Sequence, residues 1–68
     1  MIIFSNRLKE LRQSSGMSQQ QVAERLQIKQ QSYARYENGT GEPNLQTVTE
    51  IARIFDVSCD YLLGLTDY

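Results

Sequence analysis

Two glutamines and an arginine lie close together on this chain, at a spacing that could read the bases of a nucleic acid. Gln30, Gln31 and Arg35, with Ala34 between them, belong to a helical pattern that ends at Asn38-Gly39. In the major groove, a glutamine amide can bond adenine at two atoms, an arginine can bond guanine at two atoms, and an alanine can approach the thymine methyl group. The alternative is that these side chains are only the soluble surface of a helix.

A shorter helical pattern comes directly before this one. Ser18, followed three residues later by Gln21, is a capping signal, and apolar residues at helical spacing follow as far as Leu26. Two short helices joined by a tight turn, the second with polar side chains outward, can place that second helix in the major groove. We therefore expect the segment from Ser18 to Gly39 to bind double-stranded DNA.

Two side chains near the ends of these helices are candidates for contact with the DNA backbone. Gln19 stands at the start of the shorter helix, where free backbone amides and the helix dipole suit a phosphate oxygen. Lys29 is a candidate through its charge alone. Tyr33 and Tyr36 share the other face of the longer helix, and we expect them to pack inward with each hydroxyl near water or a partner.

Several short motifs occur in order along the chain: Arg7-Leu8-Lys9-Glu10-Leu11-Arg12, Gly16-Met17-Ser18-Gln19, Tyr36-Glu37-Asn38-Gly39, Glu42-Pro43-Asn44-Leu45 and Asp60-Tyr61-Leu62-Leu63-Gly64. With Ala23 where two helices would cross and Ile28 in the turn between them, the chain from about Phe4 to Gly64 resembles the phage repressor and Cro family of helix-turn-helix proteins, the lambda-repressor-like, XRE type. The resemblance implies that the third helix lies in the major groove.

The same resemblance implies roles for four polar side chains. It makes Asn38 a third candidate for phosphate contact, although Asn38 could equally serve only as a residue at a helix end. It implies that Gln19 contacts the DNA backbone and supports the recognition helix. It also joins Arg12 and Glu37 in a partly buried salt bridge between the first and third helices, which is structural rather than catalytic.

Three positions depart from the family pattern. Gln27 stands where glycine is usual in the turn, and a side chain there costs about 1 to 2 kcal/mol if the backbone is left-handed. Lys29 replaces the usual Ser or Thr and so forgoes a helix cap of about 1 kcal/mol. Thr40-Gly41 replaces a loop that is often rich in Lys or Arg, so we expect weaker affinity for the DNA backbone than in more basic relatives.

The expected fold is all-α, with residues 1–68 as one compact five-helix domain. Besides the two helices above, the sequence predicts a first helix over about residues 5–14, a fourth that begins at Asn44 and a fifth over residues 58–63. Gly16 and Gly64 stand where helices should end. The core residues that we expect from helical spacing include Phe4, Leu8, Leu11, Val22, Leu26, Leu45, Val48, Ile51, Ala52, Phe55 and Leu62.

Charge is distributed unevenly. The net charge of −1 and a pI near 5.2 argue, taken alone, against a nucleic-acid partner. However, residues 1–36 carry six Lys or Arg against two acidic residues, and residues 37–68 carry one Arg against six acidic residues. Phosphates should therefore be attracted to the first three helices and repelled from the rest.

The composition excludes several other functions. Without histidine, and with Cys59 as the one cysteine, the usual zinc spacings, an internal disulfide and a histidine base are all missing. No glycine-rich phosphate loop is present, so we expect no enzyme, no metal and no cofactor. The apolar opening, residues 1–4, is too short for a signal peptide or membrane span, and we expect a cytoplasmic protein.

One recognition helix reads only a few base pairs, so we expect a homodimer on a palindromic operator. The candidate dimer surface is the set of apolar residues left near the C-terminus: Cys59, Leu63, Leu65 and Tyr68. These residues could instead simply cover Ile2 and Ile3. The rival function is a protein-interaction module, such as an antitoxin or adaptor that keeps the helix-turn-helix shape, with the acidic half as the partner surface.

Overall fold

Residues 2–67, which the computed structural model describes, contain five helices and no strand. The helices are α1 (Ile2–Ser14), α2 (Gln19–Leu26), α3 (Gln30–Asn38), α4 (Leu45–Phe55) and α5 (Cys59–Leu63). The expected all-α class with five helices is confirmed. Across this described range, no helix combines the length and the apolar character needed to cross a membrane.

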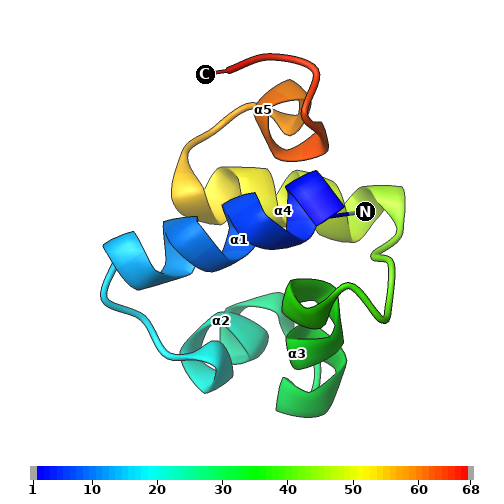
Figure 1. Cartoon of the computed structure of the whole chain (residues 1–68). Coiled ribbons are helices and arrows are strands. Elements are labelled where there is room, and N and C mark those ends of the chain that lie inside the picture. The colour runs from blue at the N-terminus through cyan, green and yellow to red at the C-terminus, as the bar shows by residue number, and fades with distance from the viewer. Residues whose placement is uncertain (1, 68) are drawn as a thin grey trace.

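The helices are arranged around α1, as Figure 1 shows. The pair α2 and α3 lies on one side of α1, and α5 lies on the opposite side. Helix α4 joins these two parts, because it packs against α2 as well as α5. The helix-turn-helix pair is therefore separated from the C-terminal part of the chain by the body of the domain.

Local side-chain caps begin three of the helices where the sequence predicts. The Ser18 hydroxyl accepts a hydrogen bond from the Gln21 amide at 3.1 Å, and the Gln21 side chain accepts one from the Ser18 amide at 2.8 Å. This is the predicted capping box, which satisfies two backbone donors that the helix leaves free. Asn44 and Ser58 cap α4 and α5 in the same manner through one bond each.

The turn between α2 and α3 carries two of the three departures from the family pattern. Gln27 is left-handed, with φ 58°, and its amide bonds the carbonyls of Ala23 and Glu24 at the end of α2. A side chain in this backbone region costs about 1 to 2 kcal/mol relative to the right-handed one. Lys29 precedes α3 without a side-chain cap. Backbone hydrogen bonds from Gln27 and Ile28 to the end of α2 therefore hold the turn in place of a glycine and a side-chain cap.

The core lies between the five helices and is built mainly from the expected residues. The buried hydrophobic side chains are Phe4, Leu8, Val22, Ala23, Leu26, Tyr33, Val48, Ile51, Ala52 and Leu62. Tyr33 is fully buried and Tyr36 packs partly buried against the same cluster, so both tyrosines point inward as predicted.

Two expectations about the helix ends were wrong. Leu45 is not a core residue, since 83% of its surface is exposed; it is the first residue of α4, and no element within residues 2–67 covers that turn. Helix α1 begins at Ile2 rather than at Ser5. Phe4 is buried one residue before the expected start, and the Ser5 hydroxyl donates to the Tyr36 carbonyl oxygen at 2.7 Å.

Candidate nucleic-acid interface

Helix α3 has one buried face and one exposed face. Tyr33 and Glu37, one turn apart, are buried with exposed fractions of 0% and 8%. Gln30, Gln31 and Arg35 are exposed, and they project from the parts of the helix that these two residues leave free. Because helical geometry fixes one face relative to the other, burial of Tyr33 and Glu37 also fixes the direction of the exposed side chains.

The predicted base-reading residues differ in how free their side chains are. Within residues 2–67, the side chains of Gln30 and Gln31 make no hydrogen bond, so their amides are available to a ligand. Arg35 lies against the loop that follows α3, where its guanidinium donates a long bond of 3.4 Å to the Thr40 carbonyl oxygen. Ala34 is half-buried. The two glutamines therefore form the most accessible part of the predicted reading surface.

The predicted phosphate-contacting residues border this surface. Lys29 and Asn38 are exposed at the two ends of α3, and Gln19 is half-buried at the first position of α2. The Gln19 side-chain amide donates to Glu37 Oε1 at 3.2 Å, which links the start of α2 to the last turn of α3. The side-chain amide nitrogen of glutamine carries two hydrogens, so Gln19 can donate a second hydrogen bond to a phosphate oxygen.

The structure brings Arg12 and Glu37 together in a two-bond ion pair. Arg12 Nε lies 2.7 Å from Glu37 Oε2, and Arg12 Nη2 donates to Oε1 at 3.1 Å. The Glu37 side chain is 2% exposed and the Arg12 side chain is 14% exposed. Arg12 also donates to the Met17 carbonyl oxygen at 3.1 Å. The pair therefore ties α1 to the end of α3 and to the loop before α2.

Tyr33 completes this cluster, and sequence reasoning did not find that contact. Its hydroxyl donates to Glu37 Oε2 from one turn earlier on α3. The carboxylate thus accepts hydrogen bonds from residues of α1, α2 and α3. The available signal was the four-residue spacing between Tyr33 and Glu37, which places both side chains on the same helix face. Within the described residues, no buried side-chain polar atom lacks a partner.

The protonation states in this cluster follow from the hydrogen bonds. Burial by itself raises the pKa of Glu37, but the bonds from Arg12, Tyr33 and Gln19 outweigh it and lower that pKa below its ordinary value. The bond to Glu37 raises the pKa of the Arg12 guanidinium. Burial, and then the bond to Glu37, raises the pKa of the Tyr33 hydroxyl. At neutral pH, Glu37 is therefore an anion held between a cation and neutral donors.

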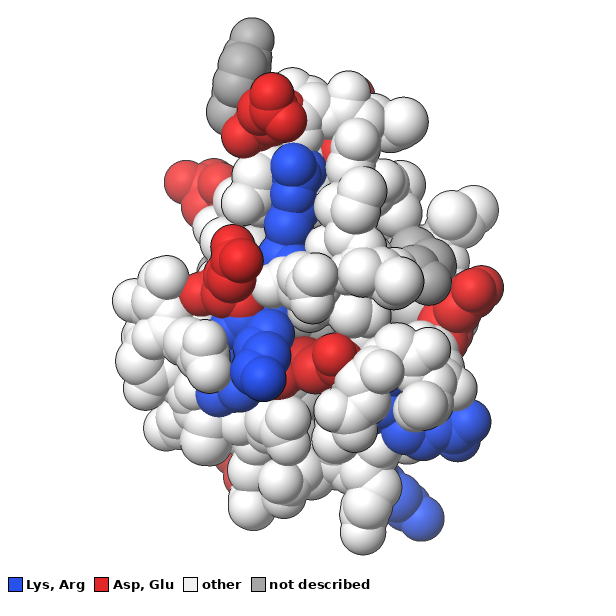
Figure 2. Space-filling model, in the orientation of Figure 1, with Lys and Arg blue, Asp and Glu red and all other residues white. Residues whose placement is uncertain are grey.

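The charge pattern separates the two halves of the molecule. On the face that Figure 2 shows, more of the acidic side chains lie in the upper part of the view than over α2 and α3, where the surface is largely uncharged with Lys and Arg side chains at its margin. A polyanion approaching α3 therefore avoids most of the carboxylates.

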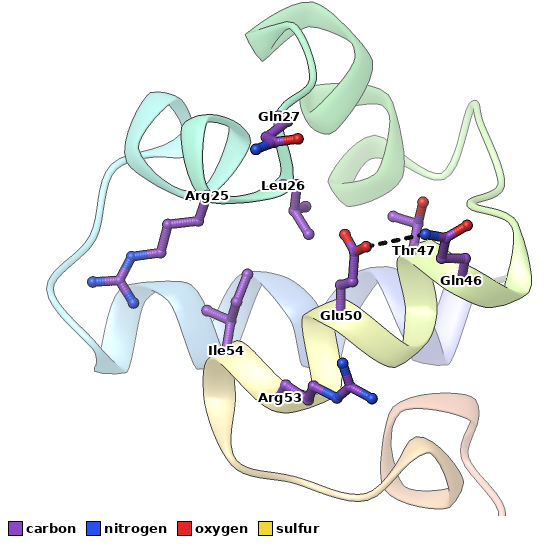
Figure 3. Close-up of a pocket in the computed structure, with 8 residues that line it drawn as sticks. All are labelled: Arg25, Leu26, Gln27, Gln46, Thr47, Glu50, Arg53 and Ile54. Atoms are coloured by element: carbon purple, nitrogen blue, oxygen red, sulfur yellow. Dashed lines mark hydrogen bonds between the residues drawn. The ribbon is translucent and has the colours of Figure 1, made fainter.

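A surface groove of about 570 Å³ lies between the end of α2 and the outer side of α4 (Figure 3). Arg25, Gln27, Glu50 and Arg53 are among the residues that line it, and Glu50 accepts a 3.5 Å bond from Gln46. None of the base-reading or phosphate-contacting candidates lines this groove. It is thus a separate surface from the exposed face of α3.

The predicted dimer residues do not all have the same surroundings. Leu65 and Leu63 are exposed, at 75% and 39%, whereas Cys59 is partly buried and packs against the core. Tyr68 lies outside the described residues. Ile2 and Ile3 keep exposed fractions of 77% and 52%, and Gly64 lies against the Ile3 side chain. The apolar surface at this end of the domain therefore includes both ends of the described chain.

Comparison with known proteins adds independent information. A protein-family model described as Helix-turn-helix matches residues 8–62. The SPbeta prophage-derived uncharacterized HTH-type transcriptional regulator YonR of Bacillus subtilis is 48% identical over 61 residues, which cover 90% of this chain and 56% of YonR. The uncharacterized HTH-type transcriptional regulator YobD of the same organism is 40% identical over 65 residues, covering 96% and 58%.

A third relative is a named repressor. The Cryptic phage CTXphi transcriptional repressor RstR of Vibrio cholerae is 33% identical over 55 residues, which cover 81% of this chain and 50% of RstR. The chain spans about half the length of the curated relatives it matches. The similarity is therefore to one part of each relative.

Proposed function

This chain belongs to the helix-turn-helix family, and on that premise we propose that it is a sequence-specific DNA-binding transcription regulator that acts as a repressor. The proposal rests on the difference between the inner and the outer face of α3. The inner face is held through Tyr33 and Glu37, and the outer face presents Gln30 and Gln31 without partners in the described chain. A helix that is held rigidly and has free side-chain amides on its outer face can form hydrogen bonds with the edges of bases.

In the proposed complex, α3 enters the major groove with its N-terminal end toward the bases. Gln30 and Gln31 pair with adenine, Arg35 contacts guanine or a phosphate from its position beside the loop, and Ala34 approaches a thymine methyl group. Gln19, Lys29 and Asn38 contact phosphates on either side and fix the position of the domain. Transcription is blocked because the operator is occupied.

We propose further that two copies act together in the cytoplasm on a palindromic operator. Their recognition helices would lie about 34 Å apart, one turn of B-DNA. The exposed side chains of Leu63 and Leu65 support a contact between copies, since this end of the domain lies across α1 from α3 (Figure 1) and remains free when α3 binds DNA. Twofold pairing would double the number of bases read.

Selection of bound DNA from a random pool tests the proposal most directly. We expect the selected sites to converge on inverted repeats, and binding to them to weaken as salt rises. Gln46, an exposed glutamine on α4, supplies the matched control: Gln46→Ala should leave the selected sequence unchanged, whereas Gln30→Ala should relax it. Failure to retain any DNA, together with co-purification of a protein partner, would favour the rival interaction module.

A further inference from the structure

The loop that joins α3 to α4 (Figure 1) holds Arg35 from two sides. The backbone amides of residues 39–41 all donate to the Arg35 carbonyl oxygen, those of Thr40 and Gly41 at 3.0 and 3.2 Å. In the other direction, Arg35 Nη2 donates to the Thr40 carbonyl oxygen at 3.4 Å. The loop therefore contacts both the backbone and the guanidinium group of Arg35.

Gly41 leaves room for the Arg35 side chain. A Cβ atom at position 41 would lie 3.2 Å from Arg35 Cβ, 3.6 Å from its Nε and 3.9 Å from its guanidinium carbon. The Gly41 backbone is not left-handed, so its conformation alone does not require glycine. Arg35 Cβ is fixed to α3, so an added methyl group would shift the loop and the guanidinium by a few tenths of an ångström.

The guanidinium of Arg35 keeps free donors while the loop holds it. A guanidinium has five N–H groups, and the Thr40 contact uses one of the two on Nη2. Within residues 2–67, the second N–H of Nη2 and both of Nη1 make no hydrogen bond. Two such donors match the O6 and N7 acceptors of guanine. Arg35 can therefore bind a guanine without leaving the loop.

A carboxylate stands beside the same side chain. A hollow of about 250 Å³ opens next to Arg35, and its walls are Ser32, Arg35, Tyr36, Gly41 and Glu42. A phosphate group that approached Arg35 through this hollow would meet the negative charge of Glu42, and like charges brought together weaken binding. Guanine carries no net charge. The surroundings of Arg35 therefore favour a base edge over the DNA backbone.

We propose that Gly41 is a positioning residue for Arg35, and that the loop after α3 directs this arginine to a guanine of the operator rather than to a phosphate. The inference rests on the proposed function, in which α3 lies in the major groove. Gly41 acts through the position of the guanidinium, and Glu42 acts through its charge. The base preference at one operator position thus depends on two residues outside the recognition helix.

Two operator fragments that differ at one atom test the guanine contact. Selection of DNA with the wild type and with Arg35→Ala identifies the guanine whose preference the variant loses. The second fragment carries 7-deazaguanine there, which lacks the N7 acceptor. We expect the wild type to bind this fragment about fivefold more weakly or worse, because part of a bidentate contact is lost. Arg35→Ala should bind the two fragments alike.

Gly41→Ala tests the positioning role. It should reduce the preference for guanine at that position by about two- to tenfold, the cost of moving a side chain off its preferred rotamer, and leave the other positions unchanged. In an Arg35→Ala background it should have no further effect, since it acts through the arginine. Thr40→Ala, which keeps the carbonyl group that Arg35 binds, is the matched control and should change no base preference.

Glu42→Gln tests the part that charge plays. It should raise affinity for an unrelated DNA fragment more than affinity for the operator, because Arg35 can then also bind phosphates. An unchanged ratio of the two affinities refutes the role of Glu42.

The remaining outcomes separate this inference from the proposed function. A chain that selects no preferred DNA sequence refutes the proposed function itself. A preferred sequence in which Arg35→Ala relaxes no guanine, or equal wild-type binding of the two operator fragments, refutes the guanine contact alone. Equal effects of Gly41→Ala with and without Arg35 refute the positioning role. Urea titration should find Gly41→Ala no less stable than the wild type, and an unfolded Gly41→Ala would show that this glycine serves the fold instead.

Discussion

Removal of Arg12 should destabilise the domain strongly, because the Glu37 carboxylate remains in place without its cation. In Arg12→Ala, the Glu37 carboxylate keeps its bonds from Tyr33 and Gln19 but loses the cation and two of its four hydrogen bonds. Since the Glu37 side chain is only 2% exposed, water cannot replace them without local opening. Breaking a buried pair from one side costs about 3 to 5 kcal/mol.

That cost is large for a chain of this size. A domain of 68 residues has a total stability of roughly 3 to 10 kcal/mol, from about 0.05 to 0.15 kcal/mol per residue. Glu37→Ala should cost several kcal/mol as well, toward the lower end of the same range, because the Arg12 side chain is 14% exposed and keeps its bond to the Met17 carbonyl. The double variant should cost clearly less than the sum, because it leaves no unpaired charge.

Urea denaturation followed by far-UV circular dichroism measures the three free energies of unfolding. We expect a coupling energy of about 2 kcal/mol or more between the two positions, within the range seen for residues in one network. Low temperature and a fixed protein concentration keep the least stable variant folded at the start of each titration. Losses that add within about 0.5 kcal/mol would show that the pair contributes no coupling, and the argument from the buried carboxylate would fail.

Three further predictions concern readout, salt and pH. Gln30→Ala or Gln31→Ala should weaken the binding free energy by about 1 to 3 kcal/mol for a DNA fragment with the preferred operator and by little for an unrelated fragment. Equal losses of affinity for the two fragments would mean that α3 does not read bases. Lys29→Ala should weaken binding to all DNA sequences alike. It should also reduce the slope of log affinity against log salt concentration by about one, which a filter-binding salt titration measures. Because the folded-state pKa of Glu37 is lowered, its stabilising contribution is complete above its ordinary value of 4.5 and is lost as pH falls through the lower folded value; Glu37→Gln should remove that part of the acid dependence in urea titrations across this window.

The beginnings of α2, α4 and α5 were predictable from the sequence because they depend on neighbouring residues. Ser18 and Asn44 cap helices through bonds that reach only three residues along the chain. The left-handed turn after α2 falls at Gln27, where the family pattern has glycine. The inward direction of Tyr33 likewise followed from helical spacing alone. Such features need no knowledge of the remaining fold.

The predicted base-reading and phosphate-contacting residues came from this local information together with the family resemblance. Spacing placed Gln30, Gln31 and Arg35 on α3, and the structure leaves all three exposed. However, spacing does not determine where a long side chain lies. The Arg35 guanidinium donates to the Thr40 carbonyl oxygen in the loop directly after α3. The Gln19 side chain donates to Glu37, because the end of α3 is close in space to the start of α2.

Only the tertiary structure decided the contacts that join distant segments. The sequence indicates that Tyr33 needs a partner, but burial of the Glu37 carboxylate between α1, α2 and α3 determines which partner it has. Leu45 has the spacing of a core residue, yet no helix covers its end of α4. The motif that begins at Arg7 did not indicate the partners of that side chain, since they are carbonyl oxygens more than fifty residues away. Backbone carbonyls are present at every residue, so only the folded arrangement selects the two that Arg7 binds.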